Sequence, residues 1–563
     1  MTGYTAQPRR RRWIAVGIVL LAVLLGSPML ARPAVAAGPY VPISGTGSTW
    51  SFVAIDAWRR NVVQYGMDVS YTGVGSTAGR NNFKNGSSDF AASEIPYGVK
   101  DGNNEDPTPA RGFAYMPDVA GGTTFMYNLR IGTRRVTNLR LSGPVLAGIF
   151  TGTITMWNAP AIRQDNPGLT LPAIRIVPVV RSDGSGATAQ FTQWMLATQH
   201  SAWTSYCARV GRTPCTQTSA YPVVSGSGMV AQSGDLGVSG YVSQPQAVGS
   251  IGYVEYSYAI ETGFPVAKML NSAGYYTEPT AGHVAVSLLK ARINMDKSNL
   301  DVYLTQNLAG VYTNSDPRTY PLSSYSYMIL PTTSEHGLNT SKGRTLGDFG
   351  KYLLCQGQHQ VDQLGYSALP INLVQAGFDQ LKRIPGAIIP ATDIRKCDNP
   401  TFSANGTNTL AVTDPFPPAC DRRGATQCAT GTGGATKQDT PVQPGARGSG
   451  SSSGGVTGGA TGTGAKGATG AQGGAATTAA AGSTGQQAAC DPDSGPCGSV
   501  SGAVNDAGQQ INGVPLASAS SLGDGLRTTL MVLAGVLLVG IALAPPLIVQ
   551  ASNRRRDRRG GAR

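Results

Sequence analysis

Three glycine- and hydroxyl-rich turns in this sequence could together hold a small oxyanion. Each turn stands where a predicted strand gives way to a predicted helix. The first backbone N–H groups of a helix have no partner within the helix, and the helix dipole is positive there. Small residues let an anion reach these groups, and Ser and Thr add hydroxyl donors. The turns comprise residues 45–50 (GTGSTW), 73–79 (GVGSTAG) and 181–188 (RSDGSGAT).

The third turn also carries an arginine, Arg181. Its guanidinium is a fixed positive charge, and its paired N–H groups match the oxygens of a small oxyanion. One such turn alone would indicate an ordinary helix cap, because Ser and Thr are common capping residues. For Arg181, the ordinary alternative is a surface ion pair with Asp183. Three turns together with an arginine favour an oxyanion site.

Strand-like and helix-like segments alternate around these turns. Apolar residues at helical spacing predict a helix over 50–65, with Ser48 and Thr49 as candidate caps. Such alternation is typical of βαβ units around a largely parallel sheet, so we expect an α/β fold. The other expected elements are strands at 41–44, 67–72, 89–93 and 174–180, a helix ending at Lys84 and a helix over 187–197.

The segments that contain these turns resemble one family, the phosphate-binding proteins of phosphate-specific ABC transporters. The resemblance covers about residues 43–388, and its motifs follow the family's order. The matching segments are 44–50 (SGTGSTW), 71–76 (YTGVGS), 88–94 (SDFAASE), 149–154 (IFTGTI), 157–158 (WN), 181–186 (RSDGSG), 249–256 (GSIGYVEY) and 364–370 (LGYSALP).

This resemblance implies a two-lobed α/β fold, periplasmic-binding-protein-like (type II), with a ligand cleft between the lobes. Lobe 1 would combine residues 38–122 with 319–400, and lobe 2 would hold 123–318. Closure of the cleft on an anion would complete the binding shell and exclude water. The implied function is the capture of inorganic phosphate, by a monomer, for import by an ABC permease, without catalysis and without a cofactor.

The resemblance also implies which residues contact the ion. The first two turns and the acidic segment that follows them would act from lobe 1, and the arginine turn from lobe 2. Asp183 would pair with Arg181 and hold its fork in place. The implied phosphate-binding residues are Thr49, Trp50 (through its backbone), Ser76, Glu94, Arg181, Ser185, Gly186 and Ala187.

Two positions depart from the family's pattern. Glu94 stands where the family has Asp. A carboxylate beside a bound dianion is repulsive unless it accepts a hydrogen bond, which hydrogen phosphate can donate and sulfate cannot. The extra methylene of Glu94 must set its carboxylate back by about 1.5 Å, so selectivity for phosphate over other oxyanions stays open. Ala187 replaces a common Thr, which removes one hydroxyl contact worth about 1 kcal/mol.

The two ends of the chain predict an exported, membrane-tethered protein. Residues 1–37 form a signal peptide, with Arg9–Arg12, an apolar run and a small-residue cleavage site. The apolar run 530–549 predicts a transmembrane helix over 528–551, and the basic tail 552–563 would be cytoplasmic. Residues 401–525 form an extension with cysteines and, from about Asp421, a flexible Gly/Ala/Thr/Ser-rich stalk. The folded part would therefore lie on the outer face of the plasma membrane.

The net charge of +13 does not indicate nucleic-acid binding. Residues 1–37 hold five Arg and no acid, and residues 553–563 hold six Arg and one Asp. The two tails therefore supply +10, which leaves about +3 for the rest of the chain. A basic nucleic-acid-binding face on the folded part is not expected.

An exported chain with eight cysteines predicts disulfides. Sequence proximity suggests three short pairs and one longer one, although connectivity cannot be deduced from sequence. A zinc site is not expected, because the sequence has no paired Cys-x-x-Cys and its four His show no ligand spacing. The suggested pairs are Cys207–Cys215, Cys420–Cys428, Cys490–Cys497 and Cys355–Cys397.

Three other functions compete with phosphate import. Residues 73–78 fit a dinucleotide-binding fingerprint, and Glu94 lies where a ribose-binding acid belongs, but the arginine turn would then be unexplained. A hydrolase is less favoured, since no Gly-x-Ser-x-Gly elbow or metal-ligand cluster is found. A surface-anchored protein that keeps the binding fold, as a phosphate sensor or adhesin without transport duty, is the main alternative.

Overall fold

The computed structural model describes residues 40–299, 302–391, 394, 397, 399–403, 405–424 and 426–443. These residues belong to one compact unit, Met1–Ser453. The predicted signal peptide, the transmembrane helix at 528–551, the basic tail, most of the stalk, and Cys490 and Cys497 lie outside the described residues.

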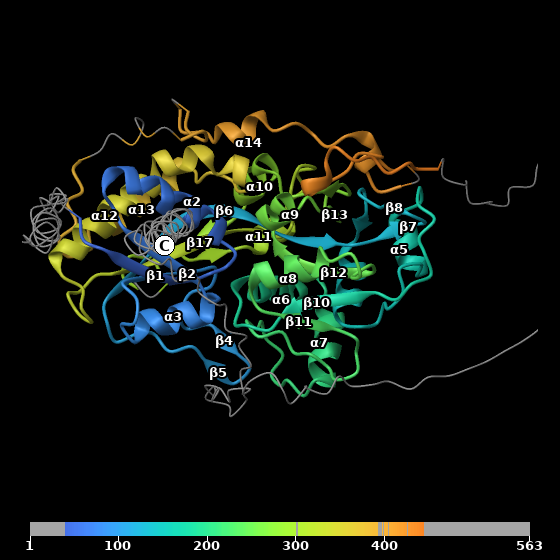
Figure 1. The fold of residues 1–563 in the computed structure, drawn as a ribbon, viewed down its shortest axis with the longest axis horizontal. Helices are drawn as coiled ribbons and strands as arrows, with labels where there is room; N and C mark the ends of the chain where they lie inside the picture. The colour runs from blue at the N-terminus through green and yellow to red at the C-terminus, as the bar shows by residue number, and fades with distance from the viewer. Residues whose placement is uncertain are drawn as a thin grey trace, which may run out of the picture. The chain divides into compact units, whose positions relative to one another are not determined.

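The unit is built on one mixed sheet with two parallel halves (Figure 1). In the first half, β1 pairs in parallel with β2 and β3, and β17 joins β3 in antiparallel. In the second half, β10 pairs in parallel with β11 and β12. These strands are β1 (Ile43–Gly47), β2 (Val69–Gly73), β3 (Phe90–Ser93), β10 (Val177–Arg181), β11 (Val230–Gln232), β12 (Ser250–Glu255) and β17 (Ser323–Pro331).

One long strand, β6 (Phe113–Tyr127), connects the two halves (Figure 1). Its first part, up to Gly122, pairs with β17, and its last part, from Thr123, pairs with β12. All fifteen of its residues are buried. The strand has no exposed face, and it therefore lacks the polar–apolar alternation that would reveal a strand in the sequence.

Short strands extend the second half or form separate two-stranded ribbons. β13 pairs with β6, β9 and β14. The remaining strands pair as β4 with β5, β7 with β8, and β15 with β16. Their bounds are β4 (Lys100–Asp101), β5 (Asn104–Glu105), β7 (Arg130–Ile131), β8 (Arg134–Arg135), β9 (Arg140–Leu141), β13 (Val266–Leu270), β14 (Tyr276–Thr277), β15 (Arg292–Ile293) and β16 (Gln306–Asn307).

Helices connect the parallel strands, as the alternation predicted. Helix α2 follows β1, α3 follows β2, α6 follows β10 and α8 follows β11. The helices are α2 (Phe52–Asn61), α3 (Ser76–Lys84), α4 (Gly143–Phe150), α5 (Pro160–Asp165), α6 (Gly186–Thr198), α7 (His200–Arg209), α8 (Gly234–Val242), α9 (Tyr256–Thr262), α10 (Ala281–Leu288), α11 (Ala309–Tyr312), α12 (Thr340–Leu354), α13 (Ile371–Leu381) and α14 (Thr409–Thr413).

The helix expected over 50–65 differs at both ends. It begins at Phe52 with Ser51 as its N-cap, and its last turn, Val62–Tyr65, is a 3-10 helix. Ser48 still contributes, because its hydroxyl accepts a 3.1 Å hydrogen bond from the N–H of Ser51. Thr49 and Trp50 therefore lie in the turn before α2 and not in the helix.

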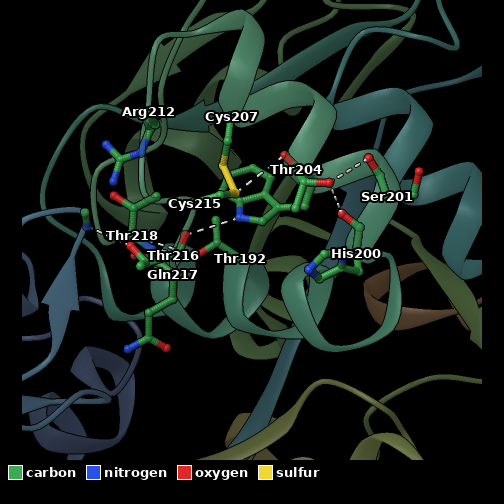
Figure 2. Close-up of a disulfide and its surroundings, with 12 residues drawn as sticks. Thr192, His200, Ser201, Thr204, Cys207, Arg212, Cys215, Thr216, Gln217 and Thr218 are labelled. Atoms are coloured by element: carbon green, nitrogen blue, oxygen red, sulfur yellow. Dashed lines mark hydrogen bonds between the residues drawn. A yellow bond between two sulfur atoms is a disulfide. The ribbon is translucent and has the colours of Figure 1, made fainter.

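Three of the four suggested disulfides are present: Cys207–Cys215, Cys355–Cys397 and Cys420–Cys428. Figure 2 shows the first of them, where Cys207 near the end of α7 is joined to Cys215 in the loop that follows. In the same loop the carbonyl of Thr216 accepts a 3.2 Å hydrogen bond from the indole of Trp203, so the bridge and this bond tie the loop to one helix.

The segment after residue 400 packs against the folded unit. In Figure 1 it runs past α14, which contacts α10, and continues toward β13. One of its contacts is an ion pair of 2.5 Å between Nζ of Lys268 and Oδ2 of Asp421. Thr432 donates from its hydroxyl to the carbonyl of Val266, and Thr440 accepts from the N–H of Thr137. The described residues from Asp421 to 443, which were predicted to belong to the stalk, therefore pack against the folded unit.

Within residues 40–443, as far as the structure describes them, no helix has both the length and the apolar character needed to cross a bilayer.

Candidate oxyanion site

The predicted turns of the two halves meet at the carboxyl ends of their parallel strands. Strands β1, β2 and β3 end at the first two turns and at Glu94, and β10 ends at the arginine turn. Parallel strands deliver their carboxyl ends to the same edge of a sheet, which is where open α/β sheets bind ligands. Direct contact joins the two halves there, because the N–H of Thr77 donates a 3.0 Å bond to the carbonyl of Gly184.

Arg181 is the buried cation of this edge, with 2% of its surface exposed. Its Nε and Nη2 donate to the two carboxylate oxygens of Asp183 at 2.8 and 2.5 Å, so the predicted pair with Asp183 is confirmed. Its Nη1 donates to Oδ2 of Asp235 at 2.5 Å. Burial alone would lower the pKa of Arg181, but the charges of Asp235 and Asp183 outweigh it and raise the pKa above its ordinary value.

Asp183 holds the guanidinium from one side. Its Oδ1 also accepts a 2.8 Å bond from the N–H of Gly234 at the start of α8. Burial opposes ionisation of Asp183, yet the charge and hydrogen bonds of Arg181 lower the pKa of this carboxyl below its ordinary value. The bidentate pair therefore fixes the plane of the guanidinium at the end of β10.

Thr49, from the other half, contacts the same guanidinium. Its hydroxyl oxygen accepts a 2.8 Å bond from Nη2 of Arg181, and its hydroxyl donates a 2.6 Å bond to Oδ2 of Asp235. The resemblance implied that Thr49 and Arg181 each contact the ion from opposite lobes, and in the structure the two side chains contact each other directly. Asp235 was not predicted, because its turn after β11 carries only one hydroxyl and one glycine. The sequence did contain one indication of Asp235, since Ser233-Gly234-Asp235 lies between a strand and a helix.

Glu94 lies at the end of β3 with 1% of its surface exposed. The Ser48 hydroxyl donates to its Oε1, and the Ser76 hydroxyl donates to its Oε2 at 2.6 Å. Burial raises the pKa of Glu94, although the two serine hydroxyls act in the opposite direction. The structure thus places Glu94 inside this cluster, shielded from solvent.

The N-terminus of α6 meets Ser76 and Glu94. The N–H of Gly186 donates a 3.1 Å bond to the hydroxyl oxygen of Ser76. A Cβ at position 186 would lie 2.0 Å from Oε2 of Glu94, so only glycine fits this approach. Ser185 caps α6 by accepting a 3.2 Å bond from the N–H of Thr188, and Ala187 is buried in the first turn of the helix.

Tyrosine hydroxyls fix the backbone of the first turn. Tyr71, Tyr258 and Tyr366 donate to the carbonyl oxygens of Ser48, Thr49 and Trp50 at 3.0, 2.6 and 2.6 Å. Burial raises the pKa of all three phenols well above the ordinary value, so they remain donors. These three bonds, together with the bond of 2.9 Å from the N–H of Ser48 to the carbonyl of Ala92, fix the backbone of the turn.

The Trp50 side chain is a packing residue, while its backbone belongs to this turn. Its indole N–H donates a 3.1 Å bond to Thr123 at the crossing of the sheet halves, and its ring lies edge-on against Tyr366. Among the residues that the structure describes, no group of three or more His, Cys, Asp or Glu side chains is arranged to hold a metal ion.

This arrangement defines a class of protein. Two α/β halves, joined by the long strand β6 and facing each other with hydroxyls, helix N-termini and an arginine, form a solute-binding protein of the periplasmic-binding-protein type. A family model described as a PBP superfamily domain matches residues 32–356.

Several curated relatives are similar over the same region. The phosphate-binding protein PstS of Xylella fastidiosa (strain Temecula1) is 33% identical over 337 residues, which is 60% of this chain and 83% of that protein. Phosphate-binding protein PstS 2 of Mycobacterium tuberculosis is 30% identical over 319 residues, which is 56% of this chain and 78% of that protein. The chain belongs to the PBP superfamily and, within it, to the PstS family of phosphate-binding proteins.

The chain is also similar to solved structures. One is the high-affinity periplasmic phosphate-binding protein PfluDING bound with phosphate, with a TM-score of 0.47, 19% identity, and coverage of 64% of this chain and 99% of that one. Another, a phosphate-binding protein from Stenotrophomonas maltophilia, has a TM-score of 0.43 and 17% identity, and covers 65% of this chain and 99% of that one.

Proposed function

We propose that this chain is an extracytoplasmic solute-binding protein that captures inorganic phosphate for import by an ABC permease. The observation that carries this proposal is the contact of 2.8 Å between Arg181 and Thr49, which joins a fixed cation of one half to a hydroxyl of the other. Membership of the PstS family supports the choice of phosphate. No catalytic role is proposed for any residue.

The ion would lie among the groups that meet at the strand ends. Thr49, Ser76 and the N–H of Trp50 would donate from the first half. Arg181, Ser185 and the N-terminal N–H groups of α6 at Gly186 and Ala187 would donate from the second half. Glu94 would accept the proton that hydrogen phosphate carries. Asp183 would act through Arg181, by holding the guanidinium in place.

The two lobes would divide where β6 changes its pairing partner. The proposed boundary at 122/123 is supported by the register, since Gly122 pairs with β17 and Thr123 with β12. The second proposed boundary is at 318/319. Rotation about this crossing would separate Thr49 and Ser76 from Arg181 and Ser185 and admit the ion. The protein would act as a monomer, because each chain supplies a complete site.

The protein would be tethered to the outer face of the plasma membrane. The charge-free run 530–549 and the arginines after it support a single membrane span with a cytoplasmic end. The Gly/Ala/Thr/Ser-rich stretch beyond residue 443 would act as a stalk. Because such a stalk is unusual for a transport receptor, a surface-anchored phosphate sensor or adhesin without transport duty is the second candidate.

Isothermal titration of the purified full chain tests the binding step. We expect saturable, one-to-one binding of inorganic phosphate, and release of phosphate unchanged. An enzyme would instead turn over a phosphoester. If saturating phosphate produces no heat and no change in tryptophan fluorescence, the proposal is wrong. Growth of a deletion strain at low phosphate then separates import from sensing, since only an importer is required for phosphate uptake.

A further inference from the structure

Asp235 contacts the same donors that the proposed function assigns to the ion. Its Oδ2 accepts from Nη1 of Arg181 at 2.5 Å and from the hydroxyl of Thr49 at 2.6 Å. Its backbone N–H donates in turn to the oxygen of Thr49 at 3.2 Å. An oxyanion held by Arg181 and Thr49 must therefore share both of them with this carboxylate.

The Asp235 side chain is fixed where it lies. It is fully buried, with 0% of its surface exposed. Its second oxygen, Oδ1, accepts a 2.9 Å bond from the N–H of Glu255 at the end of β12. Asp235 is the second residue of α8 and follows Gly234, whose N–H donates to Asp183 at 2.8 Å and whose φ is +69°. With both oxygens bonded and the backbone anchored, Asp235 has no room to turn away from an incoming ion.

We propose that Asp235 is a specificity-determining residue that works as a built-in competitor of the bound oxyanion. It lowers affinity for every anion by its charge, and it penalises an ion without a proton more than one that carries a proton. This inference rests on the proposed function and names a second carboxylate, supplied by the half opposite Glu94.

The hydroxyl of Thr49 explains how the carboxylate at position 235 lowers the affinity for the ion. A hydroxyl has one hydrogen to donate, so Thr49 donates either to Asp235 or to the ion. An uncharged side chain at position 235 would accept this hydrogen bond less strongly than the carboxylate does, because a hydrogen bond to an ionised acceptor is the stronger one. The Thr49 hydrogen would then be available to the ion, and one buried negative charge would be removed from beside it.

The test compares Asp235→Asn with the wild-type full chain by isothermal titration with inorganic phosphate and with sulfate. We expect phosphate to bind at least tenfold more tightly to the variant and the affinity for sulfate to rise by a larger factor. Asp235→Ser, which also removes the charge, should change both affinities in the same direction. An unchanged or weaker phosphate affinity in a folded variant would overturn the proposal and would make Asp235 a support for Arg181.

Two control variants distinguish an effect specific to the position of Asp235 from the general effect of removing a negative charge. Asp183→Asn removes a charge from the same guanidinium but does not touch Thr49, and it should not tighten binding, because the bidentate grip on Arg181 is lost. Asp379→Asn removes an exposed acid that pairs with Lys382 on α13 and should leave both affinities unchanged. A wild-type chain that binds no phosphate would refute the proposed function itself, whereas a binding wild type with an unimproved Asp235→Asn refutes only this inference.

Discussion

Gly186 and Glu94 lie so close that no side chain fits between them. A Cβ built at Gly186 would lie 2.0 Å from Oε2 of Glu94 and 2.8 Å from Oγ of Ser76. Gly186 begins α6 in one half of the molecule, and Glu94 directly follows β3 in the other. The side chain at position 186 therefore limits how closely the two halves can approach each other.

Gly186→Ala should weaken phosphate binding without unfolding the protein. The added methyl group would hold the halves apart, and inserting a methyl into a packed contact costs about 1–3 kcal/mol, or about 5- to 150-fold in affinity. Gly240→Ala is the matched control, because a Cβ there, on α8, meets open space. Isothermal titration and thermal unfolding of both variants give the comparison. Equal phosphate affinity in the two variants would show that the ion does not require this contact.

Arg181→Ala should abolish phosphate binding and also destabilise the protein. It removes the cation that lies between Asp183 and Asp235, and breaking a buried ion pair costs about 3–5 kcal/mol. The double variant Arg181→Ala, Asp235→Asn should recover part of the lost free energy of unfolding, since one buried charge is removed with the arginine. Its phosphate affinity should not recover. Near-native binding in either variant would contradict the assignment of Arg181 to the ion.

The pattern of turns and the resemblance predicted the residues that meet at the strand ends, but not the whole cluster. Four of these residues were predictable because they lie in glycine- and hydroxyl-rich turns at strand-to-helix junctions, and because these turns match the motifs of the family. They are Thr49, Ser76, Arg181 and Asp183. Asp235 was not predictable, because β11 has only three residues and its turn carries a single hydroxyl. The network of tyrosine hydroxyls depends on contacts up to 316 residues apart in the chain, which no local pattern encodes.

Two parts of the fold were not predicted from the sequence, each for a physical reason. Strand β6 is buried on both faces and contains Pro117 and the pair Gly121-Gly122, so it shows neither alternation nor β-favouring composition throughout. The segment around Thr432 has the composition of a flexible linker. It packs nevertheless, because the Thr432 hydroxyl bonds to the backbone of both Val266 and Thr137. Composition alone cannot show such tertiary hydrogen bonds.

Sulfate binding should depend on the protonation of Glu94. Burial raises the pKa of Glu94, so its carboxyl takes up a proton at a higher pH than an exposed glutamate does. A protonated carboxyl can donate to sulfate, whereas the carboxylate repels it, so sulfate affinity should rise as the pH falls from 8 toward 5. Glu94→Gln should bind sulfate more tightly at pH 8 and lose most of this pH dependence. Identical sulfate titrations for variant and wild type would place Glu94 away from the ion.

The longer disulfide should contribute most to stability. In the chain-entropy model, a crosslink restricts the unfolded chain more when it closes a longer loop. Cys355 and Cys397 are 42 residues apart, whereas Cys207 and Cys215 are 8 apart. Replacing both cysteines by serine should lower the free energy of unfolding by about 4 kcal/mol for the first pair and by about 2.6 kcal/mol for the second. Urea unfolding of the two double variants, each compared with the wild type, measures the difference, and a larger loss for Cys207–Cys215 would contradict it.

Glu255 should make the protein less stable as the pH rises. It lies at the crossing of the sheet halves with 0% of its surface exposed. Its Oε2 accepts a 2.6 Å bond from the N–H of Ser257, but its Oε1 has no hydrogen-bond partner among the residues that the structure describes. Burial raises the pKa of this carboxyl well above 4.5 in the folded protein. Once the pH exceeds about 4.5, the unfolded chain ionises while the folded protein keeps its proton. The folded state then binds more protons than the unfolded state, so the free energy of unfolding falls with rising pH.

Glu255→Gln removes this titration and isolates its effect from the other buried acids. Near pH 4 the variant and the wild type should have similar free energies of unfolding. At pH 7–8 the variant should be more stable, by on the order of 1–3 kcal/mol, because a neutral amide replaces a group that resists ionisation. Glu335→Gln, at an exposed position, should show no such pH-dependent gain. Urea unfolding across this pH range measures the free energy of unfolding of both proteins. If the variant is less stable than the wild type at pH 8, Glu255 is ionised and stabilising in the folded protein, and the prediction is wrong.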